Sequence, residues 1–530
     1  MKIRNIVLIS SSISLAVAGF IGLAIGSVNP KVVNAEEPDL KITNNDEFKT
    51  FRDNVNTGKN QYEGQLIRLD ADVAITLTSK PSDQEDDKYC TFKGTFDGDG
   101  HTINITIDTS DSAVGLFRNQ NGTFKNTNIT GTIVNSGKYA SPLAVYNNGT
   151  IQNVNSSITA DLSVESVSGI VFRNQTSGKI LDCSFSGDLK GTSKVGGICS
   201  DAQKGTISGC INTGSIEAKT GKYAGGILSV LGSISSNVGT NVLVTKCINK
   251  GTVTSVSDVG GITGFAYPNS KITYCSNYGS VTSTEEADGI GTGGIVGRIR
   301  NQDTTGTART LIQYCYNAGN ITANCLVGGL IGLIASHTSP KVEVKNNFST
   351  GNVTATRSSG NANAGTLIGF VNTEQLDLND SWATGTYSVQ PGVTASTYGY
   401  GIGGGTARTV ASSKAEGVSD AFREVVQFIR EYNCEEDVSS FKTKYKGLSS
   451  DEDSLLNEVN YYDENESYVR RTYKSAAEYI IGNDDSGSLL GIKVFADSEE
   501  SKLFIIITVF ALVSLTTTIG FVVLKRKKAR

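Results

Sequence analysis

Apolar and polar residues alternate over stretches of three to five positions through the centre of the chain, and glycines or polar pairs separate these stretches. The segment "ITYCSNYGSV" (272–281) sets an apolar residue, Cys, Asn, Gly and a second apolar residue at fixed offsets. Alternation with a period of two over so few residues is typical of short strands, with glycine at the corners. No 3.6-residue stripe runs through a unit, so the pattern predicts β-structure and excludes helical repeats.

The same motif occurs nine times, at spacings of 27 to 40 residues. A second motif of the "VGGI" type alternates with it, as at 195–198, 224–227 and 259–262. Self-similarity at this period indicates a solenoid, in which each unit buries its apolar face only against its neighbours. The central position of the first motif is filled, in order, by Thr127, Val154, Cys183, Cys210, Cys247, Cys275, Cys315, Asn347 and Ser381.

A unit near 27 residues predicts one turn of a three-sided, right-handed parallel β-helix. Side chains at one repeat position then stack above one another, about 4.8 Å apart. The Cys column is predicted to be a ladder of small buried groups, and metal or redox chemistry is the alternative that the absence of accompanying His or CxxC argues against. The Asn column is predicted to be an amide ladder at a corner. Its members are Asn212, Asn249, Asn277 and Asn317.

The segments on either side of the repeats have other patterns. Phe48, Phe51 and Val55 stand at helical spacing within 44–58, which predicts a short helix covering the first coil. Helical spacing returns after Ser419, where three apolar faces predict a small acidic helical module. The predicted organisation is an N-terminal cap and opening segment (36–91), β-helix repeats (92–390), an exit linker (391–418), the helical module (419–482) and a juxtamembrane spacer (483–502).

Both ends of the chain are hydrophobic. Residues 1–35 carry Lys2 and Arg4, an apolar run and a small-residue site, which predicts a signal peptide, with an uncleaved anchor as the alternative. Residues 503–524 contain no charge and are long enough to span a bilayer, and the basic tail 525–530 follows them. By the positive-inside rule, the tail is cytoplasmic. The sequence therefore predicts a single-pass protein of a bacterial cell membrane, with its ectodomain outside the cell.

The composition of the chain limits the partners and the kinds of functional site that it can have. The net charge of −5 argues against nucleic acid as a partner, and two histidines in 530 residues exclude sites built from several of them. Asp97, Asp99 and His101 form the densest cluster, which is typical of a turn. The acidic run 83–87 is interpreted as a solvated loop, with weak calcium binding as the alternative. We predict no catalytic residue, no metal site and no cofactor.

Three copies of the second motif, "GGITG" (260–264), "GGIVG" (293–297) and "GGLIG" (328–332), resemble the GLUG repeat. That repeat is found in Gram-positive surface proteins and beside the catalytic part of immunoglobulin A-cleaving metallopeptidases. "GTFDGDGHTI" (94–103) resembles the coil that opens such arrays. The resemblance implies a β-helical surface protein. It implies no peptidase activity, because the sequence contains no HExxH zinc motif.

The candidate site lies at three insertions. Most units use 12 to 15 residues between the "GG" motif and the Cys column, whereas units 226–247 and 294–315 use 21 and unit 329–347 uses 18. Extra residues at one corner are expected to project from one side of the rod and to form a binding surface. One insertion carries Arg298, Arg300 and Arg309, which suit an anionic polymer; a featureless loop is the alternative.

Three functions stay open from the sequence. The favoured one is an adhesin or binding module that displays loops from a rigid rod and contacts a glycan or protein on a host or bacterial surface. The second is a structural component of the cell envelope without a specific ligand. The third is a carbohydrate-active β-helix enzyme, which would need several acids converging on one face, and the repeats are poor in acids. We therefore expect a protein that is not an enzyme.

Overall fold

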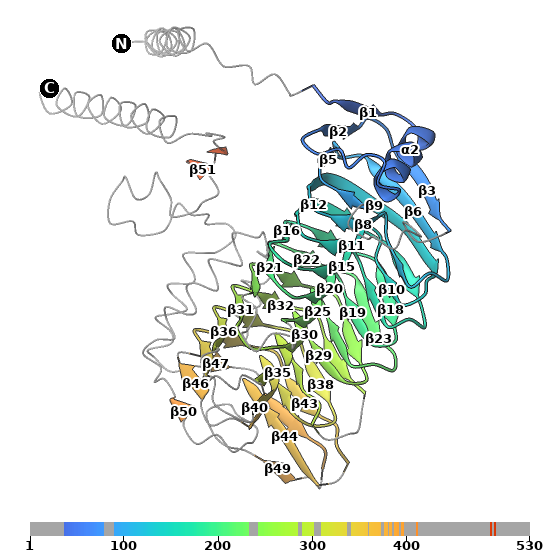
Figure 1. Cartoon of the computed structure of the whole chain (residues 1–530). Helices are drawn as coiled ribbons and strands as arrows, with labels where there is room; N and C mark the ends of the chain where they lie inside the picture. The colour runs from blue at the N-terminus through green and yellow to red at the C-terminus, as the bar shows by residue number, and fades with distance from the viewer. Residues whose placement is uncertain are drawn as a thin grey trace, which may run out of the picture.

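The computed structural model describes residues 37–396, apart from 79–89, 233–241, 285–288, 302–308, 337–340, 359, 373–375, 380, 384–385 and 392–393, and also 410–411, 488–489 and 492–493. The described chain is mainly β and winds into stacked coils that form a long rod (Figure 1). Three parallel sheets, here called A, B and C, run the length of this rod. The expectation of a parallel β-helix is therefore confirmed.

Sheet A has 30 strands and sheets B and C have ten each. The N-terminal half of sheet A comprises β1 (Leu40–Ile42), β2 (Leu66–Leu69), β3 (Val73–Leu77), β5 (Thr95–Asp97), β6 (Thr102–Asp108), β9 (Thr123–Asn135), β12 (Thr150–Ser156), β13 (Thr159–Asp161), β16 (Lys179–Leu181), β17 (Ser184–Phe185), β18 (Asp188–Gly191), β21 (Gly205–Ser208), β22 (Ile211–Asn212) and β23 (Ser215–Ala218). Its C-terminal half comprises β26 (Val242–Thr245), β27 (Ile248–Asn249), β28 (Val253–Ser255), β31 (Ser270–Thr273), β32 (Ser276–Asn277), β33 (Val281–Ser283), β36 (Arg309–Gln313), β37 (Tyr316–Asn317), β38 (Ile321–Ala323), β41 (Lys341–Lys345), β42 (Phe348–Ser349), β43 (Val353–Ala355), β46 (Leu376–Asn379), β47 (Trp382–Ala383), β48 (Tyr387–Val389) and β50 (Val410–Ala411).

The other two sheets lie on the remaining sides of each coil. Sheet B comprises β4 (Thr91–Phe92), β8 (Phe117–Gln120), β11 (Ala144–Asn147), β15 (Val171–Asn174), β20 (Cys199–Ala202), β25 (Leu228–Leu231), β30 (Thr263–Ala266), β35 (Val296–Asn301), β40 (Ile331–Ser336) and β45 (Ile368–Asn372). Sheet C comprises β7 (Ala113–Val114), β10 (Tyr139–Ala140), β14 (Ser166–Ser168), β19 (Lys194–Gly196), β24 (Tyr223–Gly225), β29 (Asp258–Gly260), β34 (Thr292–Gly293), β39 (Val327–Gly328), β44 (Asn361–Gly365) and β49 (Thr394–Ser396).

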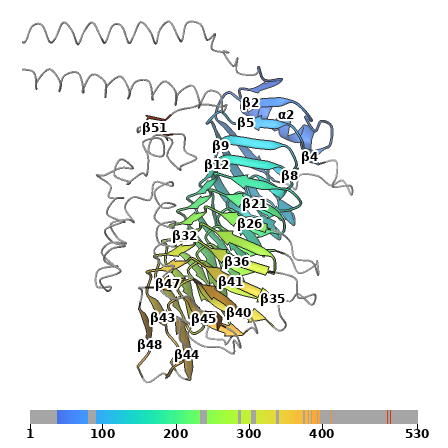
Figure 2. The ribbon, with the colours of Figure 1, turned by 90° about the vertical axis from the view of Figure 1, so that its left-hand side faces the viewer.

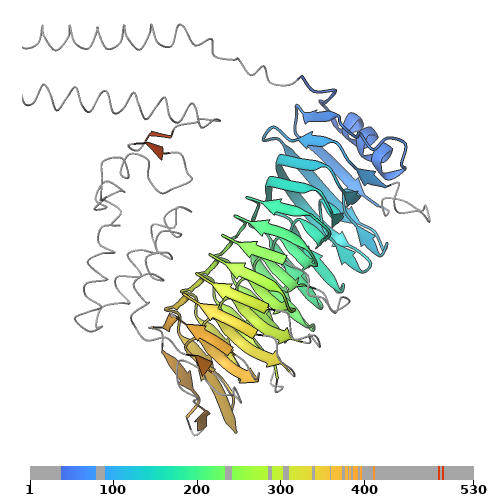
Figure 3. The ribbon, with the colours of Figure 1, turned by 60° about the vertical axis from the view of Figure 1, so that its left-hand side comes forward.

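One coil of the regular region contains five short strands. In the coil that starts at residue 179, β16, β17 and β18 belong to sheet A, β19 to sheet C and β20 to sheet B. Each strand pairs with its equivalents in the coils above and below, so the arrows of one sheet stack in a column (Figures 2 and 3). As a result, side chains at equivalent positions of a repeated motif form one column along the rod.

A helix covers the N-terminal end of the rod, as the spacing of its apolar residues predicts. Helix α2 (Asn45–Asn56) begins at Asn44, whose side chain accepts the backbone N–H groups of Asp46 and Glu47. Phe51 packs against Phe92 and Phe96 of the first coils, at ring-centroid distances of 5.8 and 5.6 Å. The helix thereby shields the apolar end of the solenoid from water.

The Cys column is buried, as predicted. Cys183, Cys210, Cys247, Cys275 and Cys315 are almost wholly inaccessible, and none forms a disulfide. The thiol of Cys275 lies 3.3 Å from the carbonyl of Thr273 and 3.8 Å from that of Val244 in the preceding coil. Burial raises the pKa of Cys183, Cys210, Cys247 and Cys275 well above the ordinary range, so these thiols stay protonated.

The Asn column forms the predicted amide ladder. Asn212, Asn249 and Asn277 each donate a side-chain N–H to the amide oxygen of the next member, over 2.7, 2.7 and 2.8 Å. The second N–H of each amide goes to the backbone carbonyl two residues later, as from Asn277 to Gly279 over 2.9 Å. Both donors of these buried side chains are therefore satisfied within the stack.

The two repeated motifs meet at this ladder. A Cβ built on Gly261, the second glycine of its "GG" pair, would lie 2.3 Å from the Asn277 amide and 2.2 Å from the Gly294 carbonyl. Gly226 and Gly294 have the same relation to Asn249 and Asn317. The glycine of one motif is required because the asparagine of the other fills the space beside it.

A left-handed backbone residue precedes the Cys column in coil after coil. At this position φ lies between +51° and +67°, although glycine occurs there only once. The turn bends sheet A, so that a single coil contributes several of its strands. These residues are Asn126, Asn153, Asp182, Gly209, Lys246, Tyr274, Tyr314 and Asn346.

Several predictions concern segments that lie largely or wholly outside the described residues. These segments are the signal peptide, most of the exit linker, the helical module, most of the spacer, the span 503–524 and the acidic run 83–87. The described part of the chain contains no helix with the length and apolar character needed to cross a membrane. Beyond residue 390, β49 and β50 continue the parallel pairing, and β51 (Ser488–Leu489) and β52 (Ile492–Lys493) form an antiparallel pair.

Replacement of Cys275 tests the packing of its column. Cys275→Val keeps an apolar group of similar size and is expected to change the free energy of unfolding by less than about 1.5 kcal/mol. Cys275→Asp buries a carboxylate without a partner and is expected to cost several kcal/mol. Denaturant unfolding of both variants measures the difference, and rapid thiol labelling of the native wild type would contradict burial.

Replacement of Asn277 tests the amide ladder. Asn277→Ala leaves an N–H of Asn249 and the amide oxygen of Asn317 without their partners, and is expected to lower the free energy of unfolding by about 2 to 4 kcal/mol. Asn155→Ala is the matched control, because Asn155 makes the same amide contact with Asn128 on the exposed surface. Its expected effect is below about 0.5 kcal/mol. Equal effects of the two changes would show that burial of the ladder contributes nothing.

Candidate ligand-binding surface

The three insertions arise at one corner of the rod. Each follows a strand of sheet B and precedes one of sheet A: β25 to β26, β35 to β36, and β40 to β41. The segments between these strands are 232–241, 302–308 and 337–340, whereas 203–204 and 267–269 connect the same sheets after β20 and β30. Strands β35 and β40 are also six residues long, against four in β20, β25 and β30. The predicted common corner is confirmed by the strand order.

Arg298 lies on the outer side of sheet B at the base of the second insertion. Its Nε is 3.1 Å from Oδ1 of Asp258, a carboxylate whose side chain is only 2% exposed, and it also donates to the Gly289 carbonyl. The backbone N–H of Gly291 donates to the same Asp258 oxygen over 2.7 Å. Burial raises the pKa of Asp258 to about 7, against the opposing effect of Arg298. Arg298 is thus held in place by a buried ion pair between sheets C and B.

Aromatic rings surround this arginine. The Phe265 ring lies between those of Tyr223 and Tyr267, at centroid distances of 4.7 and 4.8 Å, and the Arg298 guanidinium is 6.0 Å from its centre. Phe265 is buried and the two tyrosines are half-buried. Burial raises the pKa of both phenols, and the charge of Arg300 opposes that rise. We call Tyr223, Phe265, Tyr267, Arg298 and Arg300 the aromatic–arginine surface.

Arg309 lies elsewhere. It begins β36 of sheet A, its backbone N–H donates to Asn269, and its 70% exposed side chain is 3.4 Å from Glu343. Glu343 in turn pairs with Lys345 over 2.9 Å. Of the three predicted ligand residues, Arg298 and Arg300 lie on one strand, β35, beside the aromatic rings of neighbouring coils. Arg309 lies instead in an ion-pair network on sheet A.

The aromatic residues of this surface were absent from the sequence prediction. The signal for them was present, because aligning "GGITGFAY" (260–267) with "GGIVGRIR" (293–300) places Phe265 above Arg298 and Tyr267 above Arg300. The strand register confirms the first of these pairs. Alternate residues of a strand share a face, so the second pair follows on the same side.

A second cluster of the same kind lies nearer the N-terminus of the rod. Tyr139 stacks on Phe172 with centroids 4.2 Å apart, and the Arg173 guanidinium lies 4.9 Å from the Phe172 centroid. Nε and one terminal nitrogen of Arg173 lie 3.0 and 2.9 Å from Asp201, which is nearly buried. Tyr146 lies beside both Phe172 and Arg173. An aromatic ring, an arginine and a buried aspartate therefore recur together on the outside of sheet B.

The other sequence candidates are accounted for by the fold. Asp97 accepts from the Asp99 backbone and from Asn126, and pairs with Lys125 over 3.1 Å, as expected of a turn between coils. His101 lies 3.3 Å from Asp72. Among the residues that the structure describes, no group of three or more His, Cys, Asp or Glu side chains is placed to hold a metal ion.

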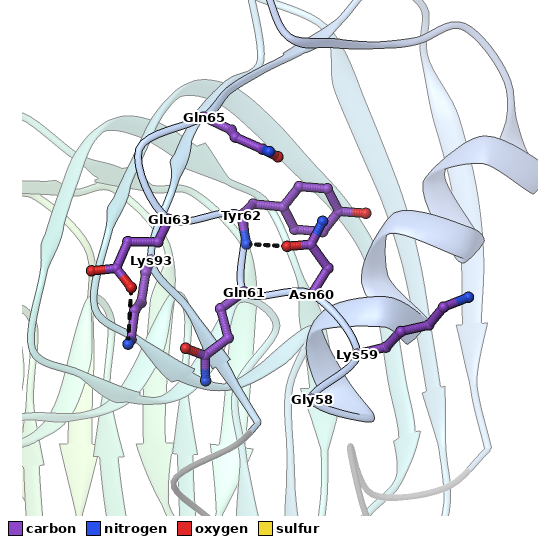
Figure 4. Close-up of a pocket in the computed structure, with 8 residues that line it drawn as sticks. All are labelled: Gly58, Lys59, Asn60, Gln61, Tyr62, Glu63, Gln65 and Lys93. Atoms are coloured by element: carbon purple, nitrogen blue, oxygen red, sulfur yellow. Dashed lines mark hydrogen bonds and ion pairs between the residues drawn. The ribbon is translucent and has the colours of Figure 1, made fainter.

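A polar surface pocket of about 730 Å³ lies beside the loop that follows α2 (Figure 4). Within it, Asn60 accepts the backbone N–H of Tyr62 over 2.8 Å, and Lys93 pairs with Glu63 over 3.2 Å. The first contact stabilises the loop itself, and the second joins it to the first coil. The pocket is explained by the packing of that loop, and two pairs of its polar groups bond to each other.

Comparison with known proteins adds little. No protein-family model matches the chain, and no curated protein does. The chain is matched by the solved structure of a putative immunoglobulin A1 protease from Bacteroides ovatus, with 16% sequence identity and a TM-score of 0.33, covering 73% of this chain and 87% of that chain. Similarity at this level carries no inference about function, so the GLUG resemblance rests on the motifs themselves.

The buried ion pair gives a pH dependence of stability. Because the pKa of Asp258 is near 7 in the folded state and near 3.8 when unfolded, the folded form binds this proton more tightly, and the resulting penalty grows as pH rises from about 4 to 7. Asp258→Asn removes this titration. We expect the wild type to lose stability relative to Asp258→Asn over that interval, measured by urea unfolding at each pH. A constant difference between the two proteins would refute it.

Proposed function

We propose that the protein is a membrane-anchored binding module that displays the β-helical rod on the outside of a bacterial cell. The observation that carries the proposal is the common corner of the three insertions, at β25, β35 and β40, beside the aromatic–arginine surface. Loops at one corner can change in length without disturbing the stacked strands, which is typical of binding surfaces on solenoids. The hydrophobic ends at 1–35 and 503–524 support export and anchoring.

The two alternative functions, a structural component and an enzyme, require different features of the same surface. A structural envelope component needs no partly exposed arginines held by buried carboxylates. A carbohydrate-active enzyme needs acids that converge on a substrate, and Asp258 and Asp201 are instead buried beneath arginines. We therefore propose binding without cleavage, and release of sugar fragments from a bound glycan would overturn this choice.

The proposal predicts that the insertions are needed for binding and not for folding. Shortening 232–241 and 302–308 to the length of 267–269 is expected to abolish attachment of expressing cells to a glycan and host-protein array. The β-sheet signal in far-ultraviolet circular dichroism is expected to persist, because the corner contributes little to the core. Undiminished attachment by the shortened protein would exclude a role for these loops.

A control experiment on the same cells tests whether the rod is displayed on the surface. The rod is expected to be accessible to an antibody added to intact cells, and the basic tail 525–530 only after permeabilisation. Failure of antibody to reach the rod in intact cells would overturn the proposed location, whatever the outcome of the array.

A further inference from the structure

We infer that residues 419–482, the segment in which the sequence shows three apolar faces at helical spacing, pack against the outer side of sheet A in the C-terminal half of the rod. The inference concerns a contact within the chain and is independent of the proposed function. Three observations carry it: an outer column of side chains that changes from exposed to buried along the rod, the aromatic residues that gather around it, and the place where the chain leaves the sheet.

One outer column of sheet A changes in character along the rod. It runs in register through Asn155, Ser184, Ile211, Ile248, Ser276, Tyr316 and Phe348. Each of these residues follows a member of the inward column that holds the cysteines, so its side chain points outward. The first three are exposed or half-buried, whereas the last four are at most 1% exposed.

Burial on the outer side of a sheet requires a cover. Neighbours in a column lie beside a side chain, about 4.8 Å away, and leave its outer tip in water. Tyr316 and Phe348 meet in this way, with ring centroids 6.4 Å apart, and the Tyr316 hydroxyl lies 2.9 Å from that of Thr350. The change from exposed to buried at one position of one sheet therefore marks where a further layer lies over it.

Aromatic rings gather where the column is buried. Tyr274 and Tyr314 occupy the left-handed position of two successive coils and stack with centroids 4.8 Å apart. Tyr278 meets Tyr316 edge to face at 5.6 Å. In the N-terminal coils the same left-handed position holds asparagine or aspartate, so the aromatic character is confined to the covered half. We call Ile248, Tyr274, Tyr278, Tyr314, Tyr316 and Phe348 the outer aromatic face.

The chain leaves the repeats beside this face. Strand β50 pairs with β46 of sheet A (Figure 1). The next strand of that coil, β47, pairs with β42, which carries Phe348. Seven residues, 412–418, separate β50 from Ser419, and an extended chain of that length spans up to about 24 Å. The segment 419–482 therefore starts within reach of the outer aromatic face.

The segment also has the side chains that such a contact needs. Phe422, Val425 and Ile429 stand at helical spacing in its first part. Four strand steps separate β27 from β47, which is about 19 Å at the usual spacing, and a helix of about 13 residues has that length. A short tether gives the segment an effective concentration that a second copy of the chain does not reach, so the chain's own segment is the occupant.

Limited proteolysis of the purified full-length protein tests the inference. Cleavage of the wild type within 419–482 is expected to be slow, because a docked segment is cut only when it opens. Tyr316→Ser combined with Phe348→Ser is expected to speed that cleavage about tenfold or more, because it removes two apolar contacts. The column already holds serine at positions 184 and 276, so the β-sheet signal in circular dichroism is expected to persist.

Tyr146→Ser is the matched control, because Tyr146 is a half-buried ring on the outside of sheet B. It is expected to leave the cleavage rate unchanged. Rapid cleavage of the wild type within 419–482, or equal rates in the wild type and the double variant, would overturn the inference. Light scattering identifies the other occupant: a wild-type dimer that the double change dissociates without altering the cleavage rate would show that a second copy covers the face.

Discussion

The contact between an asparagine and the glycine beside it is the constraint on which the rod depends. Asn249, Asn277 and Asn317 each fill a space that a Cβ on Gly226, Gly261 or Gly294 would occupy. Those glycines leave room for the amides, which bond to one another along the ladder. Both repeated motifs are therefore halves of one interaction, and a substitution in either half disturbs the same corner of the coil.

This constraint separates positions that are fixed from positions that are free to vary. The inward columns accept small or apolar groups, so Thr127, Val154 and the cysteines are interchangeable in one line of the core. The left-handed position just before them holds Asn, Asp, Lys, Tyr and once Gly, because its backbone is imposed by the turn and its side chain is not in the core. Tyr274 and Tyr314 stack there at 4.8 Å without altering the coil.

The features predicted correctly from the sequence are those whose residues recur along the chain. The helix over the first coil, the buried cysteines, the amide ladder and the common corner of the insertions each follow from residue types that return at fixed offsets. A second ladder was missed: Gln120, Asn147 and Asn174 align in sheet B, and Asn147 donates to Asn174 over 2.7 Å. It covers only three coils before alanine and leucine replace it at Ala202 and Leu231, so no long periodic signal marks it.

The Asp258–Arg298 pair was missed for a different reason. The two residues are far apart in the motif alignment and occupy different sheets, and only the winding of the coil brings them together. Arg298 was predicted as a loop residue because it follows a "GG" motif, whereas it belongs to a strand that is longer than its equivalents. Its environment depends on which side chain the preceding coil presents, and that information is lost when each unit is considered alone.

Parallel strand pairing also fixes the distances between the insertions along the rod. Residues 232–241 follow β25, 302–308 follow β35 and 337–340 follow β40, so the bases of these loops are two strands and one strand apart. At the usual strand spacing these intervals are about 10 and 5 Å. Lengthening a loop leaves these heights unchanged, and adding a coil shifts them by one whole step. The separations between attachment points on this protein can therefore change only in multiples of a single fixed distance.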